Sequence, residues 1–169
     1  PVSELQGMPI NQVCIGSCTN SSMLDMLTVA AMLKGKTVHP DVSLSISPGS
    51  KQVYTMLAEC GALADLISAG ARILECACGP CIGMGFSPKS AGVSLRTFNR
   101  NFLARSGTAD AQVYLVSPET AAASAIAGVF TDPTTLGKAP EIAVPTHFHI
   151  NDNLIEMPAS AEEAGDITV

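Results

Sequence analysis

Three cysteines in two short phrases have the residue type and spacing for metal chemistry. Cys18 lies in the run Ser17-Cys18-Thr19-Asn20-Ser21, and the other two frame the run Cys78-Gly79-Pro80-Cys81. Three thiolates can hold an iron–sulfur cluster at three corners and leave its fourth iron without a protein ligand. An open iron can act as a Lewis acid, whereas a cluster held by four cysteines mainly carries electrons. The pattern therefore favours chemistry on a bound molecule.

The two phrases lie where loops of an α/β fold can meet. Cys18 comes where a predicted strand passes into a helix, so exposed N–H groups and the positive end of the helix dipole favour a thiolate there. Cys78 and Cys81 flank a Gly-Pro turn that can direct both sulfurs to one centre. If both loops follow parallel strands, they open at the same edge of the sheet.

The spacing by itself leaves two other readings open. A single Cys-x-x-Cys can be half of a zinc site, or it can be a redox pair. Structural zinc normally needs a second closely spaced pair of ligands, and none appears. His39, His147 and His149 could donate, but His39 follows a predicted helix end and the other two lie in residues 131–169. A redox pair of the thioredoxin type would open a helix directly, but a glycine-rich stretch follows Cys81 instead.

The other three cysteines have simpler interpretations. Cys14 falls in a predicted buried strand and Cys60 at a predicted helix end, and cysteines in such places are commonly small core residues. Cys76 alternates with Cys78 like the end of a strand, so both would point to the same side. We predict a structural role for all three.

A second chemical phrase lies in residues 99–107, which we call the arginine loop. It contains Asn99, Arg100, Asn101 and Arg105. Guanidinium groups offer paired donors that match a carboxylate, so the loop is a candidate carboxylate-binding surface. The alternative is an ordinary solvated loop with surface arginines.

Short apolar strands alternate with helices along the chain, which predicts an α/β fold. We expect a largely parallel or mixed sheet flanked by helices in α/β/α layers. The predicted strands are residues 12–16, 42–47, 71–75, 93–97 and 112–116. The predicted helices are residues 23–34, 51–59, 62–68 and 117–129. Residues 76–92, which we call the cysteine loop, are too rich in Gly, Cys and Pro for either element.

Composition limits the classes of protein that fit. The 169 residues are 47% hydrophobic and carry a net charge of −6, which gives no basic surface for nucleic acid. No stretch has the roughly 20 apolar residues of a membrane span. Six cysteines without a small disulfide scaffold fit a reducing compartment, so we expect the cytoplasm, with an organelle matrix as the alternative. The chain starts at Pro1, and we expect a piece of a longer protein.

Taken together, these phrases resemble the cluster-binding third domain of the aconitase family, which includes the isopropylmalate and homoaconitate isomerases. The resemblance rests on residues 15–21, on Cys78-Gly79-Pro80-Cys81-Ile82-Gly83, on Asn99-Arg100-Asn101-Phe102 and on Ser117-Pro118-Glu119 before an alanine-rich helix. It covers the chain from about Val13 to about Val129. Ala104, where many members have glycine, is a small departure from the family pattern, and so is Cys76.

The resemblance implies a site and a reaction. Cys18, Cys78 and Cys81 would hold a [4Fe-4S] cluster whose open iron binds substrate. Arg100 and Arg105 would hold substrate carboxylates, and Asn99 would donate a hydrogen bond near the cluster. The reaction implied is isomerisation of citrate to isocitrate through cis-aconitate, because Cys-Gly-Pro-Cys is more typical of aconitase than of the isopropylmalate enzymes.

The resemblance also implies what lies elsewhere. The family's catalytic serine base and other substrate contacts belong to further domains or a subunit, so we expect no catalytic base here and little activity from the chain alone. We divide the chain into a cluster domain, residues 1–130, and a connector, residues 131–169, that leads to a further domain. The alternatives are an isopropylmalate or homoaconitate isomerase large-subunit domain, and a regulator that binds RNA after cluster loss. The acidic balance argues against RNA as a partner.

Overall fold

The computed structural model describes residues 1–153, 155–160 and 162–164, and a parallel sheet lies at its centre. The strands are β1 (Gln12–Ile15), β2 (Ser43–Ile46), β3 (Arg72–Ile73), β4 (Val93–Arg96) and β5 (Gln112–Leu115). Their order in the sheet is β3-β2-β1-β4-β5, and each pairs with its neighbours in parallel. The order reverses between β1 and β4, where open α/β sheets commonly bind ligands.

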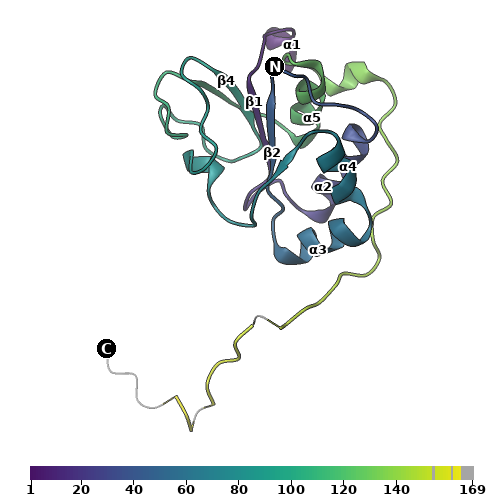
Figure 1. Cartoon of the computed structure of the whole chain (residues 1–169), viewed down its shortest axis with the longest axis vertical. Helices are drawn as coiled ribbons and strands as arrows, with labels where there is room; N and C mark the ends of the chain where they lie inside the picture. The colour runs from purple at the N-terminus through teal and green to yellow at the C-terminus, as the bar shows by residue number, and fades with distance from the viewer. Residues whose placement is uncertain (154, 161, 165–169) are drawn as a thin grey trace.

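Helices flank the sheet on the right of Figure 1, and long loops lie on the left. The α-helices are α1 (Val2–Leu5), α2 (Met23–Leu33), α3 (Lys51–Glu59), α4 (Ala62–Ser68) and α5 (Pro118–Ala127). Two short 3-10 helices are η1 (Pro80–Ile82) and η2 (Pro133–Leu136). Helix α2 packs against α4 and α5, and α5 also packs on β1.

Local sequence signals explain where the longer helices begin. Ser22 and Asp25 form a capping box at α2, in which the Asp25 N–H donates to Ser22 Oγ at 3.2 Å and the Ser22 N–H donates to Asp25 Oδ2 at 2.9 Å. Ser50 caps α3, and Ser117 caps α5 ahead of a proline in its first turn. These caps fix where each loop that precedes a helix must end.

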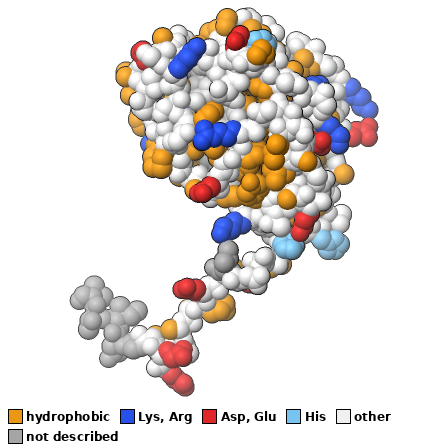
Figure 2. Space-filling view, in the orientation of Figure 1, with side chains coloured by type: hydrophobic (Ala, Val, Ile, Leu, Met, Phe, Trp, Pro, Cys, Tyr) orange, Lys and Arg blue, Asp and Glu red, His pale blue; other side chains and the backbone are white. Residues whose placement is uncertain are grey.

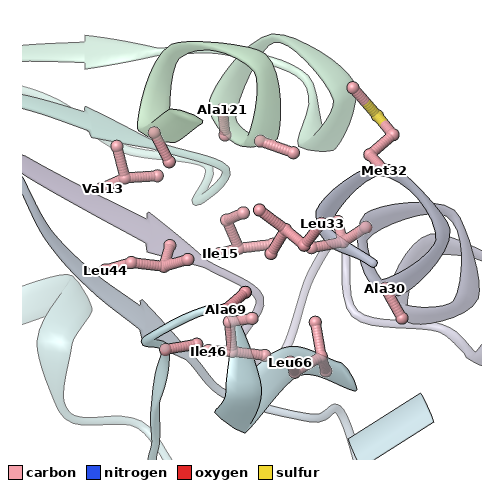
Figure 3. Packing of buried hydrophobic residues seen from close by; sticks show 14 of the residues in the cluster. Val13, Ile15, Ala30, Met32, Leu33, Leu44, Ile46, Leu66, Ala69 and Ala121 are labelled. Carbon is pink, nitrogen blue, oxygen red and sulfur yellow. The ribbon is translucent and has the colours of Figure 1, made fainter. Parts of the chain in front are cut away.

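The two faces of the sheet differ in chemistry because neighbouring residues of a strand point to opposite sides. Val13 and Ile15 of β1 are buried and point toward Ala121 of α5 and Leu33 of α2, as Figure 3 shows. Burying an aliphatic side chain of this kind contributes about 1.5–3 kcal/mol. The core therefore lies between the sheet and the helices.

The other face of β1 and β4 is polar although it is buried. Gln12, Ser94 and Arg96 share this face, and all three are almost fully buried. The cysteine loop covers them, since Gln12 Nε2 donates to the Ser87 carbonyl at 3.0 Å and Arg96 donates to the Pro80 carbonyl. Among the described residues, this covering layer consists of loop and η1.

The α/β class and the helix-flanked parallel sheet are confirmed, and most element bounds agree within one or two residues. Strand β3 is shorter than predicted because it is an edge strand that pairs only with β2, through Ser45–Arg72 and Ile46–Ile73. Cys14 is fully buried, as expected. The expectation of a buried Cys60 is wrong: this residue is exposed just beyond the end of α3, because the turn at Gly61 carries it out of the core.

The segment after α5 first packs on the domain and then extends away from the sheet. Phe130 is buried, and the Asp132 N–H donates to Gln6 Oε1 at 2.9 Å. After η2 the chain crosses toward α3, where Gln52 donates to the His149 carbonyl. Figure 2 shows the last part of this segment extending from the rounded body, with acidic side chains along it.

No helix in the described ranges is long and apolar enough to cross a membrane. The division at residue 130 stays a prediction.

Candidate metal centre

Three loops that carry the predicted site residues meet at one edge of the sheet. Cys18 follows β1, the cysteine loop follows β3, and the arginine loop follows β4. Because all strands are parallel, their carboxyl ends share this edge. Sequence positions that are far apart are therefore neighbours here.

The loop that carries Cys18 is fixed from both sides. The Gly16 N–H donates to Thr97 Oγ1 at 2.8 Å, and Asn20 Nδ2 donates to the Thr97 carbonyl at 2.6 Å. Gly16 has φ +78°, and a Cβ there would lie 2.3 Å from the Ser47 carbonyl oxygen. Glycine is thus required at this turn. The Cys18 side chain, two residues further on, is exposed.

The Cys78–Cys81 turn is ordered by its own backbone. The Gly83 N–H donates to the Pro80 carbonyl at 3.0 Å and the Met84 N–H donates to the Gly79 carbonyl at 3.0 Å, which closes η1. Cys78 is exposed and Cys81 is half-buried. The turn therefore presents both thiols at the rim of the site.

The structure brings the three predicted ligands together. The Cys81 thiol, and then the Cys18 thiol, raise the pKa of Cys78 through like-charge repulsion and sulfur hydrogen bonds. Such effects act over short distances, so the Cys78 sulfur lies near the sulfurs of Cys81 and Cys18. All six cysteines of the chain are free.

Three thiols are the donor set that a [4Fe-4S] cluster with one open iron requires. Within residues 1–153, 155–160 and 162–164, no three His, Cys, Asp or Glu side chains converge as a single metal ion requires. A [4Fe-4S] cluster binds each thiolate through a different iron, so its ligands surround a larger centre. Three free, adjacent thiols with exposed or half-buried sulfurs fit that donor set.

The arginine loop packs against the cysteine loop. A Cβ at Gly83 would lie only 2.0 Å from the Ser106 carbonyl oxygen, so the two backbones are in direct contact. Arg105 is half-buried with its guanidinium 5.4 Å from the centre of the Phe102 ring. Its Nε is buried and has no hydrogen-bond partner in the described structure. Arg105 thus has donor capacity left for a ligand.

Asn99 and Arg100 lie at the start of the same loop and are exposed. Among the described residues, no hydrogen bond fixes either side chain. Apolar side chains next to them are also exposed: Phe102 is 61% and Leu103 80% accessible. The structure therefore places both residues at the open rim, without showing a contact to the thiols.

Sequence reasoning missed the residues that support the site. Arg96, Gln12, Thr97 and Asn20 hold the loops in place, and only Asn20 lies in a phrase that the sequence singled out. A charged residue at the end of a predicted buried strand was the available signal for Arg96. Its partner in the cysteine loop could not be read from spacing.

A separate cavity of about 690 Å³ lies between α2, η2 and the segment after it. Its lining includes Thr28, Met32 and Pro140, and none of the predicted site residues. It is therefore no part of the metal centre.

Comparison with known proteins agrees with this architecture. The family model described as the aconitase family (aconitate hydratase) matches residues 1–128. The 3-isopropylmalate dehydratase large subunit of Sulfurihydrogenibium sp. is 44% identical over 143 residues, which are 84% of this chain and 33% of that protein. The 3-isopropylmalate dehydratase large subunit 1 of Methanopyrus kandleri is 46% identical over 134 residues, 79% of this chain and 32% of that protein.

A third similar protein is the 3-isopropylmalate dehydratase large subunit of Caldanaerobacter subterraneus, 45% identical over 134 residues. It is covered to 32% of its length, so the chain spans about a third of the relatives it matches. The parallel sheet, with three loops at the carboxyl ends of its strands, is that of an α/β domain. The chain belongs to the aconitase family.

Proposed function

We propose that this chain is the cluster-bearing part of an aconitase-family hydro-lyase. Cys18, Cys78 and Cys81 hold a [4Fe-4S] cluster by three of its irons. The observation that carries the proposal is that Cys78 lies near both Cys81 and Cys18, although the two loops involved follow different strands, β3 and β1. Family membership supports the same ligand set.

When bound, the cluster supplies an open iron that acts as a Lewis acid on a substrate hydroxyl. The chain's own residues bind and orient the substrate. Arg105 has a buried Nε without a partner, and it donates to a substrate carboxylate. Arg100 binds a second carboxylate from the exposed start of the loop, and Asn99 donates a hydrogen bond beside it. The base that removes the proton comes from another part of the whole protein.

For the substrate, we favour an isopropylmalate-type hydroxy acid over citrate. Cys-Gly-Pro-Cys suggested the citrate reaction, but the relatives reported above are named 3-isopropylmalate dehydratase large subunits. Those names match the alternative drawn from the sequence better than its first reading. The motif carries two of the proposed cluster ligands, so it bears more directly on the cluster than on substrate choice.

The proposal includes partners. The relatives are named large subunits, which implies that the whole protein works with a second subunit or further domains that complete the site. We propose the cytoplasm as its location, on the basis of the free thiols.

The test is anaerobic reconstitution of the chain with iron and sulfide, followed by iron and acid-labile sulfide counts and EPR after mild oxidation. We expect about four irons per chain, with loss of one iron to give a three-iron signal. Cys18→Ser, Cys78→Ser and Cys81→Ser lose the cluster, whereas the exposed Cys60→Ser keeps it. Tight zinc in place of iron, or equal loss in Cys60→Ser, contradicts the proposal. Hydration assays of the whole protein with isopropylmalate and citrate then decide the substrate.

A further inference from the structure

Arg96, at the end of β4, is a buried cation without a carboxylate partner. Its side chain is 0% exposed, which is rare for arginine unless it is paired. In the part of the chain that the structure describes, no Asp or Glu forms an ion pair with it. An uncompensated buried charge costs several kcal/mol. Groups other than carboxylates therefore surround this cation.

Hydrogen bonds hold the guanidinium in one orientation. Its Nε donates to Ser94 Oγ at 2.9 Å, and one terminal nitrogen, Nη2, donates to Gln12 Oε1 at 2.9 Å. The other terminal nitrogen, Nη1, donates to the carbonyl of Pro80, the residue before Cys81. The guanidinium carbon also lies 5.5 Å from the centre of the Phe98 ring. Arg96 thus connects the sheet to the turn that carries two of the thiols.

The nearest groups that could become anionic are thiols. Burial lowers the pKa of Arg96, and Cys14 and Cys81 oppose that change by attraction. Burial raises the pKa of Cys14, so this thiol is neutral near pH 7 and offers no countercharge. Cys81 is half-buried at the rim and belongs to the ligand set. Through its bond to the Pro80 carbonyl, the Arg96 cation lies against the turn that carries Cys81, on the side of the metal centre.

We propose that Arg96 is a positioning residue of this centre, with two roles. It holds the Pro80 carbonyl so that the Cys78–Cys81 turn keeps its shape, and its cation is the countercharge of the anionic, thiolate-bound cluster. The second role rests on the proposed function, because it requires the cluster. The first does not, and it can be tested on metal-free protein.

The experiment compares Arg96→Gln, Arg96→Lys and Arg72→Gln after anaerobic reconstitution. Arg72→Gln is the matched control, since it removes an exposed arginine that stacks on Phe86 of the same loop at 5.7 Å. The readouts are the rate of iron loss to a chelator, followed by visible absorbance, and the midpoint potential. We expect Arg96→Gln to lose iron about tenfold faster or more, because a hydrogen bond from a charged group contributes about 1.5–3 kcal/mol. Its potential falls, because removing a cation disfavours the reduced, more negative cluster.

Arg96→Lys keeps the charge but loses the fork of donors, so we expect it to lose iron faster than wild type but less than tenfold faster. The control keeps the wild-type rate and potential. Iron loss in folded Arg96→Gln at the wild-type rate overturns the proposal. If Arg96→Gln does not fold, Arg96→Lys decides: iron loss tenfold faster than wild type overturns the countercharge role.

Hydrogen exchange on metal-free protein tests the first role separately. The Gly83 and Met84 amides close the turn, so we expect them to exchange faster in Arg96→Gln than in wild type or Arg72→Gln. Equal exchange contradicts the anchoring role. If wild type loads no cluster, the proposed function fails, and this exchange measurement still decides whether Arg96 anchors the loop.

Discussion

Asn20 and Thr97 are joined across the site: Asn20 Nδ2 donates to the Thr97 carbonyl oxygen at 2.6 Å. Asn20 has φ +50°, a left-handed conformation that asparagine tolerates better than most residues. The bond ties the loop of Cys18 to the end of β4, just before the arginine loop. Two of the three loops of the metal centre thus share one anchor.

The side chain of Thr97 is a second part of that anchor, and Thr97→Val tests it. Valine keeps the shape but removes Oγ1, which accepts from the buried Gly16 N–H at 2.8 Å. A buried donor left without a partner costs about 1–3 kcal/mol, so we expect that loss in the free energy of unfolding. Thr97→Ser keeps the hydroxyl, so we expect a smaller loss of unfolding free energy than in Thr97→Val. Denaturant unfolding of both variants checks this, and equal losses would show that the hydroxyl is unimportant.

Close contact between the cysteine and arginine loops makes Gly83 irreplaceable. Gly83→Ala places a Cβ 2.0 Å from the Ser106 carbonyl oxygen, at φ +82°. Left-handed strain and overpacking together predict that Gly83→Ala lowers the free energy of unfolding by about 3 kcal/mol. We also expect the variant to load the cluster less completely. Gly35→Ala is the control, because φ is +68° there and no atom lies within 4 Å of the added Cβ. Thermal unfolding should show a clearly smaller effect for Gly35→Ala; similar losses would mean that only backbone strain matters.

Ala104, in the arginine loop, has a left-handed backbone conformation with φ +61°. Ala104→Gly removes left-handed strain of about 1–2 kcal/mol from the folded state. Glycine also gives the unfolded chain more conformational freedom, which lowers the free energy of unfolding by about 0.4–1 kcal/mol. We therefore expect a gain of about 0.5–1 kcal/mol in unfolding free energy. Ala109→Gly, in the segment just after this loop and without a positive φ, should only destabilise. A loss of stability in Ala104→Gly would contradict this reading of the loop.

The proximity of the three thiols can be measured in metal-free protein by alkylation. Cys81 and then Cys18 raise the pKa of Cys78, so its reactive thiolate is scarcer at a given pH than that of an ordinary thiol. We expect the pH midpoint for iodoacetamide modification of Cys78 to lie above that of a short cysteine peptide. Replacing both Cys18 and Cys81 with serine should lower the midpoint. An unchanged midpoint in that variant would show that the thiols are not neighbours.

Local signals predicted the helices best. The bounds of α3 and α4 agree with the prediction, because serine and glycine mark their ends and helix hydrogen bonds are local. The strand at residues 71–75 was overestimated, since strand length depends on the partner β2 rather than on the strand itself. Cys60 was wrongly expected to be buried, because periodicity does not reveal which way the chain turns after a helix.

The sequence by itself determined the chemical types and their order: three thiols in two phrases, two arginines in a loop, and strands that place these loops at one edge. Only the tertiary structure decided how the loops are held. The polar side chains of Gln12, Ser94 and Arg96 are buried because the cysteine loop covers one face of the sheet. That arrangement depends on contacts between residues far apart in the chain, which no local spacing encodes.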